Sequence, residues 1–195
     1  MLGLNICRKE KRRITLRERH SLTISFSPNQ TWSADFMSDA LGCGRRFRTF
    51  NVIDDFNREV LGIEIDLSLP SRRVIQVLDN IGMIRGYPLR LRLDNGPELV
   101  SLALADWAEK HGVTLEFIQP GKPTQNSYIE RFNRTYREEV LDFYIFKNLD
   151  EIREITEKWM NQYNKERPHQ SLKNMTPIEY NLFTKNTENY TIPWY

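Results

Sequence analysis

Apolar and polar residues alternate along the first part of the chain, a period of two that is typical of β-strands. Three such segments follow one another at residues 31–40, 46–54 and 59–67, and they are rich in Phe, Val, Ile and Thr. Leu41-Gly-Cys-Gly44 supplies the turn between the first two segments. The pattern therefore predicts that the domain opens with an antiparallel meander of three strands.

The spacing of apolar residues changes to a helical period after Pro70, which predicts a helix over residues 70–86. The apolar positions of this helix are Val74, Val77, Leu78, Ile81 and Ile84 or Met83. A short buried strand at 89–93, a helix at 99–110 and a strand at 113–118 follow. Because strands that alternate with helices usually pair in parallel, the whole sheet is predicted to be mixed.

The remainder of the chain is predicted to be helical after one irregular segment. Residues 119–124 contain two prolines and a glycine, so they form a loop that leads into the helix of Glu130. A later helix carries an apolar stripe and must stop at Pro168. Its stripe is Leu149, Ile152, Ile155, Trp159 and Tyr163. Thr176-Pro-Ile-Glu179 is a capping box that starts a final short helix.

Composition indicates a single soluble domain with an uneven charge distribution. The chain has 195 residues, 39% of them hydrophobic and 28% charged, which is ordinary for a globular protein. Residues 1–20 carry seven Lys or Arg against two Glu, a net charge of +5 that leaves −3 for the rest. This basic arm, which includes Arg12 and Arg13, suits contact with DNA phosphates. The alternative is a solvated, disordered leader.

The two cysteines and three histidines show no metal-site spacing. Cys7 and Cys43 are far apart and neither belongs to a Cys-x-x-Cys pair, so we expect no zinc site. Two lone thiols fit a reducing cytoplasm. No apolar run approaches the roughly 20 residues of a membrane span, so we expect no membrane contact.

Three carboxylates lie in settings that suit metal-dependent phosphoryl transfer. Asp35 lies in the first predicted strand, and Asp94 ends the 89–93 strand just before the turn Asn95-Gly-Pro97. Glu130 follows thirty-five intervening residues later, near the start of a helix. Mg²⁺ prefers oxygen ligands and keeps several waters, so a few convergent carboxylates and a substrate phosphate suffice to bind it.

Four sequence motifs occur in order around these carboxylates. They are Asp94-Asn-Gly-Pro-Glu98, Gly121-Lys-Pro-Thr-Gln-Asn126, Glu130-Arg-Phe-Asn133 and Tyr163-Asn-Lys-Glu-Arg-Pro-His169, the last followed by the capping box. Together they resemble the integrase core of the IS3 family of bacterial insertion-sequence transposases, from about residue 29 to about residue 183. The resemblance implies an α/β, ribonuclease H-like fold, with a five-stranded mixed sheet flanked by helices. The order of predicted elements also favours this fold.

The resemblance further implies that Asp35, Asp94 and Glu130 are a catalytic DDE triad. In such enzymes the triad holds two Mg²⁺ ions, for which Mn²⁺ can substitute, and DNA is cut at the element ends and joined to a target phosphodiester. Asp35 and Asp94, on adjacent strands, would form the rigid half of the site, and Glu130 would complete it from a helix. Without metal, repulsion between like charges would hold Glu130 away.

The helix of Glu130 also carries candidate DNA contacts. Asn126, Glu130, Arg134 and Arg137 are spaced four, four and three residues apart, so they share one face. Arg137 matches a Lys/Arg position at which the family touches DNA near the cleaved bond. The further expected DNA contacts are Lys122, Asn133, Arg12 and Arg13. The alternative for Arg134 and Arg137 is pairing with neighbouring glutamates on a solvated helix.

Other acidic residues favour structural roles. Asp39 lies at a strand end, and Asp54 and Asp55 lie at a strand–turn junction, where carboxylates commonly make local hydrogen bonds. We therefore expect none of the three to be catalytic.

We expect four regions: a basic arm (1–28), a catalytic core (29–146), a helical extension of the core (147–184) and a tail (185–195). The expected partners are element-end and target DNA, an upstream helix-turn-helix protein or fused region, and further copies of the chain on DNA. The expected location is the bacterial cytoplasm, at the nucleoid. One alternative is RNA hydrolysis, which the motifs at residues 121–126 and 163–179 disfavour. Another is a truncated, non-catalytic fragment that binds DNA or a partner transposase.

Overall fold

The computed structural model describes residues 25–96, 98–118 and 126–189. Its strands are β1 (Thr31–Ala40), β2 (Arg46–Asp54), β3 (Val60–Asp66), β4 (Arg90–Leu93) and β5 (Thr114–Phe117). Its helices are α1 (Ser71–Arg85), α2 (Leu102–His111), α3 (Ser127–Tyr136), α4 (Leu149–Lys165) and α5 (Pro177–Asn189), with a π-helical turn η2 (Arg137–Leu141) and a 3-10 turn η3 (Gln170–Leu172). No helix within these residues is both long and apolar enough to cross a membrane.

The described strands form one sheet in the order β3-β2-β1-β4-β5. β1 pairs antiparallel with β2, and β2 with β3, which gives the predicted meander. β4 pairs in parallel with β1 on one side and with β5 on the other. The predicted mixed sheet of five strands is therefore confirmed, and β1 is its central strand.

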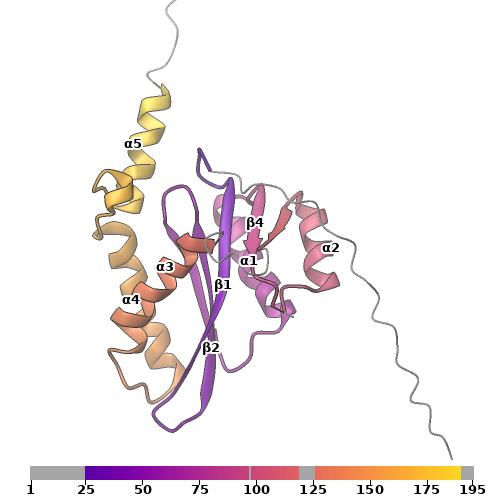
Figure 1. Cartoon of the computed structure of the whole chain (residues 1–195), viewed down its shortest axis with the longest axis vertical. Coiled ribbons are helices and arrows are strands. Elements are labelled where there is room, and N and C mark those ends of the chain that lie inside the picture. Colours follow the sequence, from indigo (N-terminus) through magenta and orange to yellow (C-terminus); the bar gives the residue numbers. More distant parts are fainter. Residues whose placement is uncertain (1–24, 97, 119–125, 190–195) are drawn as a thin grey trace, which may run out of the picture.

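Different helices cover the two faces of the sheet (Figure 1). One cluster of buried residues joins the sheet to α1 and α2, and a second cluster joins it to α3 and α4. Trp32 and Ala34 of β1 belong to the first cluster and Met37 to the second. Because successive side chains of a strand point to opposite faces, Asp35 lies on the same side as Met37, facing α3.

The predicted helix after Pro70 is confirmed as α1, but its apolar face is shorter than predicted. Val74, Val77, Leu78 and Ile81 are buried, whereas Met83 and Ile84 are 76% and 87% exposed. The buried face ends at Gly82 because the Tyr87 ring packs there. A Cβ on Gly82 would lie 2.4 Å from that ring, so no larger residue fits.

The second predicted helix begins at Leu102 rather than at Leu99. Ser101 caps it by accepting a hydrogen bond from the Leu104 N–H at 3.3 Å. At the other end, Gly112 adopts a left-handed φ of 68° and terminates the helix. The side-chain cap therefore decides where the helix starts, and apolar spacing alone does not show it.

The C-terminal helices follow the predicted pattern. α4 ends before Pro168 and buries Ile152, Trp159 and Tyr163 against the α3 side of the sheet. The predicted capping box of α5 is also confirmed. The Thr176 hydroxyl accepts the Glu179 N–H at 3.2 Å, and the Glu179 carboxylate accepts the Thr176 N–H at 2.8 Å.

Candidate active site

Asp35 lies in the middle of β1 and faces α3. Its carboxylate accepts hydrogen bonds from the Phe36 N–H at 2.8 Å and from the Asn133 side-chain amide at 2.9 Å. Burial raises the pKa of Asp35 to about 6, the Phe36 N–H opposes this rise, and the charges of Asp94 and Glu130 raise the pKa further. The other two carboxylates of the predicted triad are therefore near enough to act on Asp35 electrostatically.

Asp94 comes beside Asp35 because β4 runs parallel to β1. Leu93 lies opposite Ala34 in this pairing, so the next residue of each strand is one of the two aspartates. The Asp94 Oδ1 atom accepts the Gly96 N–H at 3.0 Å. A Cβ on Gly96 would lie 3.0 Å from the same oxygen, so glycine lets the turn fold back over the carboxylate.

The segment after Asp94 is held from two sides. The Asn95 side chain donates to the Ile118 carbonyl, just beyond β5, at 2.6 Å. Glu98 forms an ion pair with Arg48 of β2. The hydrogen bond from Arg48 lowers the pKa of Glu98, which favours the ionised carboxylate. The positive charge of Arg48 balances the negative charge of that carboxylate. We therefore leave Glu98 outside the acidic site.

Glu130 lies in the first turn of α3 and is exposed. Its carboxylate makes no hydrogen bond or ion pair with any residue that the structure describes. Asn133, three residues later and on the same face of the helix, bonds to Asp35. The position of Glu130 relative to Asp35 therefore depends on how α3 as a whole is seated on the sheet.

A buried pair of amides holds Asn133 over the sheet. Asn51 of β2 lies opposite Asp35 in the antiparallel register and is fully buried. Its Nδ2 donates to Asn133 Oδ1 at 2.7 Å, and Asn133 Nδ2 in turn donates to Asp35 Oδ2 at 2.9 Å. The sequence interpretation did not include Asn51. The available signal was an amide inside the otherwise apolar run from Phe50 to Ile53.

Asp54 and Asp55 have structural roles. Asp55 is buried, pairs with Arg92 at 2.5 Å and accepts the Ser33 hydroxyl at 2.6 Å. Asp54 accepts two backbone N–H groups, at 2.8 and 2.9 Å. These bonds use both carboxylates to fix the β2–β3 turn against its neighbours.

Two family models match this chain, and both are described as an integrase core domain. One match covers residues 26–123 and the other covers residues 111–177. The chain belongs to the integrase core domain family. The matched residues include Asp35, Asp94 and Glu130.

Several similar proteins come from insertion elements of bacteria. An uncharacterized 31.7 kDa protein of insertion element IS407 from Burkholderia multivorans is 43% identical over 91% of this chain and 64% of its own length. An uncharacterized 39.2 kDa protein of IS476 from Xanthomonas euvesicatoria is 39% identical over 95% of this chain and 54% of its own. A putative transposase of IS150 from Escherichia coli is 28% identical. The predicted resemblance to insertion-sequence transposases is confirmed, and the chain spans only 54–64% of these relatives.

Solved retroviral integrase structures have the same fold. A chain of a simian T-cell lymphotropic virus intasome superposes with a TM-score of 0.68, at 17% identity over 92% of this chain and 63% of that one. The HTLV-2 integrase catalytic core, solved with magnesium, gives 0.66 at 16% identity over 80% of this chain and 98% of that core. The predicted ribonuclease H-like fold is therefore confirmed.

The donor set of the candidate site fits a divalent cation, which prefers carboxylate oxygens. A cation would offset the burial and the like charges that raise the pKa of Asp35. Within residues 25–96, 98–118 and 126–189, however, no three Asp, Glu, His or Cys side chains stand close enough to hold a metal ion. Since repulsion disfavours a closer approach of bare carboxylates, the structure contains the parts of such a site rather than a formed one.

The two arginines expected near DNA differ in their surroundings. Arg134 is exposed, and its side chain makes no hydrogen bond or ion pair with a described residue. Arg137 begins the π-helical turn, where its guanidinium donates to the Asp39 carboxylate at 3.2 Å and to the Ser38 carbonyl at 3.0 Å. Asp39, expected to be structural, thus binds an arginine that was expected to contact DNA.

The remaining expected DNA contacts are either buried or outside the described residues. Asn126 is 3% exposed and Asn133 is 8% exposed, so neither side chain faces solvent in this structure. Lys122, Arg12 and Arg13 lie outside the residues that the structure describes. Their DNA-binding roles stay predictions.

Proposed function

We propose that this chain supplies the catalytic core of an insertion-sequence transposase. It would cut DNA at the ends of the element and join the freed 3′-hydroxyl to a target phosphodiester. The observation that best supports this function is the adjacency of Asp35 and Asp94 at the paired strands β1 and β4, with Glu130 of α3 near enough to add its charge to the burial that raises the pKa of Asp35. Membership of the integrase core domain family supports DNA as the substrate.

Asp35, Asp94 and Glu130 would hold two Mg²⁺ ions or, in their place, Mn²⁺. The chemistry that bound cations supply is activation of the attacking oxygen and stabilisation of the leaving 3′-oxygen. Asp35 and Asp94 are positioned by paired strands, which gives that half of the site a rigid base. Asn133 orients the Asp35 carboxylate by donating to its Oδ2 atom. Glu130 is the member that a helix brings to the other two.

Arg134 and Arg137 would bind phosphates of the DNA beside the reacting bond. Guanidinium groups bind phosphate oxygens in pairs, and both residues lie within two turns of Glu130. Arg134 is available as it stands, whereas Arg137 would exchange its Asp39 and Ser38 contacts for a phosphate. Phosphate contacts of this kind position DNA without reading its sequence.

Sequence-specific binding of the element ends would come from a helix-turn-helix partner or fused region. The relatives are longer than this chain, which spans 64% of the IS407 protein and 54% of the IS476 protein. We also propose that several copies assemble on DNA, since one of the similar integrase structures belongs to an intasome.

An assay of cleavage and joining tests this function. Duplexes that carry the element ends are incubated with the chain, alone and joined to the upstream part of its own element, with Mg²⁺ or Mn²⁺. Asp35→Asn, Asp94→Asn and Glu130→Gln should each abolish both steps and leave the fold intact, because one site serves both. Asp106→Asn, an exposed carboxylate on α2, is the matched control and should keep full activity.

Two outcomes would contradict the proposal. Loss of only one of the two steps in a triad variant would exclude a shared site. Binding of DNA with neither cleavage nor joining, in either metal and with the upstream part present, would favour a non-catalytic, DNA-binding fragment. Asp55→Asn is unsuitable as a control, because it would leave Arg92 buried beside a neutral partner.

A further inference from the structure

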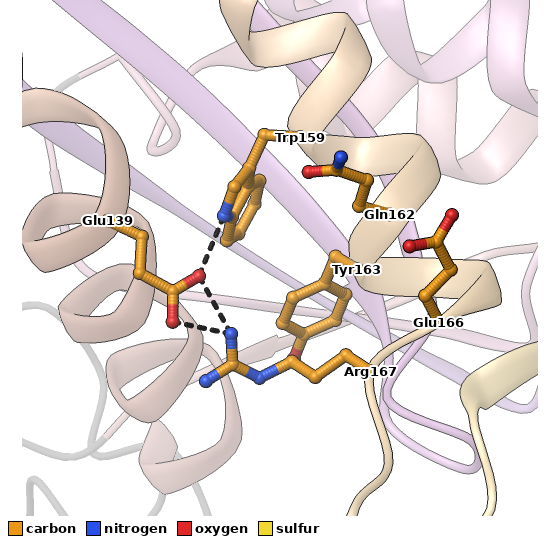
Figure 2. Close-up of a pocket in the computed structure, with 6 residues that line it drawn as sticks. All are labelled: Glu139, Trp159, Gln162, Tyr163, Glu166 and Arg167. Carbon is orange, nitrogen blue, oxygen red and sulfur yellow. Dashed lines mark hydrogen bonds and ion pairs between the residues drawn. The ribbon is translucent and has the colours of Figure 1, made fainter.

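The sequence motif Tyr163-Asn-Lys-Glu-Arg-Pro-His169 contributes no residue to the candidate active site, yet most of its side chains make contacts with other parts of the fold. It runs from the last turn of α4 into the segment before η3. A pocket of about 320 Å³ lies at this place, and Figure 2 shows the residues that line it, from η2, α4 and the segment after α4. The pocket is lined by Glu139, Trp159, Gln162, Tyr163, Glu166 and Arg167.

Glu139 of η2 is bound from two sides in this pocket. Arg167 Nη1 donates to both of its carboxylate oxygens, at 2.5 and 2.7 Å, and the Trp159 Nε1 donates at 2.8 Å. Figure 2 shows the carboxylate between the guanidinium and the indole. A charged acceptor with two donors that come from α4 and the segment after it ties η2 to this end of α4. Because η2 continues directly from α3, these hydrogen bonds also restrain the helix that carries Glu130.

The same end of α4 is also tied to the sheet. Asn164 accepts the Val60 N–H and donates to the Val60 carbonyl, each at 2.9 Å. β3 is the outer strand of the sheet, so Asn164 makes with its backbone the pair of bonds that another strand would make. Asn164 and Arg167 are three residues apart. The residues from Asn164 to Arg167 therefore connect the outer strand of the sheet to η2, and through η2 to α3.

Aromatic packing fills the space between these two links. Tyr163 packs edge-on against Phe132 of α3, with ring centroids 5.3 Å apart. Trp159 lies 5.2 Å from the ring of Tyr136, whose hydroxyl shares a buried hydrogen bond of 2.7 Å with Thr156. His169 lies against the other side of the cluster, with its ring 5.1 Å from that of Tyr163. The contact between α3 and α4 thus extends along the whole of α3 beyond Glu130.

We infer that Arg167, through Glu139, is a positioning residue for Glu130, and that Asn164 anchors it to the sheet. The Glu130 carboxylate makes no hydrogen bond or ion pair with a described residue, so its place depends on the seating of α3. Besides the aromatic packing and the contacts of Arg137 with β1, that seating has two supports. Asn133 holds α3 to β1 and β2, and the bonds at the end of α4 hold its continuation. The assignment of an effect on Glu130 rests on the function proposed above.

The test compares Arg167→Ala and Arg167→Lys with Arg153→Ala in the full chain. Arg153 is the matched control. It is an arginine of α4, whereas Arg167 lies just beyond that helix. Its side chain is 43% exposed against 39% for Arg167, and it bonds to the Ile65 carbonyl of β3 but to no described residue of η2. Two experiments are done below the unfolding temperature of every variant. The first measures kcat and KM for strand joining, and the second measures the rate of amide hydrogen exchange in α3.

Arg167→Ala should lower kcat by about tenfold or more with little change in KM for DNA, because small displacements of a reacting group are costly. Arg167→Lys keeps the positive charge and one nitrogen donor on a different side chain and should recover part of the loss. Exchange in residues 127–136 should become about tenfold faster in Arg167→Ala and stay unchanged in Arg153→Ala. Glu139→Gln should repeat the effect, and combining it with Arg167→Ala should add little more.

Three results would overturn the inference. A raised KM with unchanged kcat would make Arg167 a DNA contact. A lower unfolding temperature with unchanged kcat and unchanged exchange in α3 would make it merely structural. Equal effects of Arg153→Ala would remove the special role of η2. If the wild-type chain joins no DNA, the proposed function fails, but the exchange measurement still decides whether Arg167 holds α3.

Discussion

Asp35 is a residue whose charged form the fold destabilises. Its pKa is raised from the ordinary 3.8 to about 6, so between about pH 4 and pH 6 the folded state holds a proton that the unfolded chain has lost. Stability contributed by Asp35 therefore falls as pH rises through this window, and the cost remains at neutral pH.

Replacing Asp35 should consequently stabilise the metal-free chain. Asp35→Asn removes the charge but leaves a single acceptor oxygen for the two donors, the Phe36 N–H and Asn133, so we expect a net gain of about 1–2 kcal/mol in the free energy of unfolding at pH 7. The gain should vanish below about pH 4, where both forms are neutral. Denaturant unfolding of both proteins from pH 4 to pH 8 measures it. A pH-independent difference would contradict the raised pKa.

Asn133 should matter for stability as well as for the site. Asn133→Ala removes the donor to Asp35 and leaves the buried Asn51 amide without that acceptor, so we expect a loss of about 1–3 kcal/mol. Asn161→Ala, at an exposed position on α4, is the control and should change stability by less than about 0.5 kcal/mol. Equal losses in the two variants, measured by denaturant unfolding, would show that the amide pair contributes nothing.

At the scale of elements, apolar spacing predicted every strand and helix that frames the site, but not the details that side chains decide. The start of α2 depends on the Ser101 cap, and the end of the α1 face depends on Tyr87 lying over Gly82. The π-helical turn after Tyr136 has no signal in the apolar pattern, since Val140 suits either helix type. Local chemistry and contacts distant in sequence account for these differences.

The same limit applies to the candidate site. The three candidate carboxylates could be named from the sequence because each lies in a recognisable motif, and their catalytic role stays a prediction. Asn51 and the Arg137–Asp39 pair could not, because each joins residues 82 or 98 positions apart through the register of β1 and β2 and the seating of α3. Such side-chain pairs cannot be predicted from the sequence unless the position of the covering helix on the sheet is known.

The face of α3 and η2 gives a prediction about DNA. Each lost phosphate contact should lower the slope of log affinity against log salt by about 0.9, so Arg134→Ala and Arg137→Ala should each shallow the dependence by about one unit. Filter binding or fluorescence anisotropy over a range of salt measures this. Asp39→Asn, which releases Arg137 from its partner, should strengthen binding. An unchanged slope in Arg137→Ala would mean that Arg137 serves only the pair with Asp39.

At the scale of the whole molecule, the fold places three carboxylates that the sequence separates widely within electrostatic reach of one another, although not close enough to hold a metal ion as they stand. Asp35 comes from the central strand, Asp94 from the parallel neighbour of that strand, and Glu130 from a helix held by the sheet on one side and by α4 on the other. Helix α4 shares a buried cluster with β1, β2 and α3. It therefore belongs to the support of the site, and we propose that removing it would disable the site.

Binding of a divalent cation tests the central claim most directly. Mn²⁺ is titrated calorimetrically into the chain at pH 7.5, above the pKa of Asp35. The wild type should bind, and Asp35→Asn, Asp94→Asn and Glu130→Gln should each weaken binding by about tenfold or more, since each replaces a charged oxygen by an amide. Asp106→Asn should bind as the wild type does. Equal affinity in the wild type and all three triad variants, or no binding by the wild type, would contradict a shared carboxylate site.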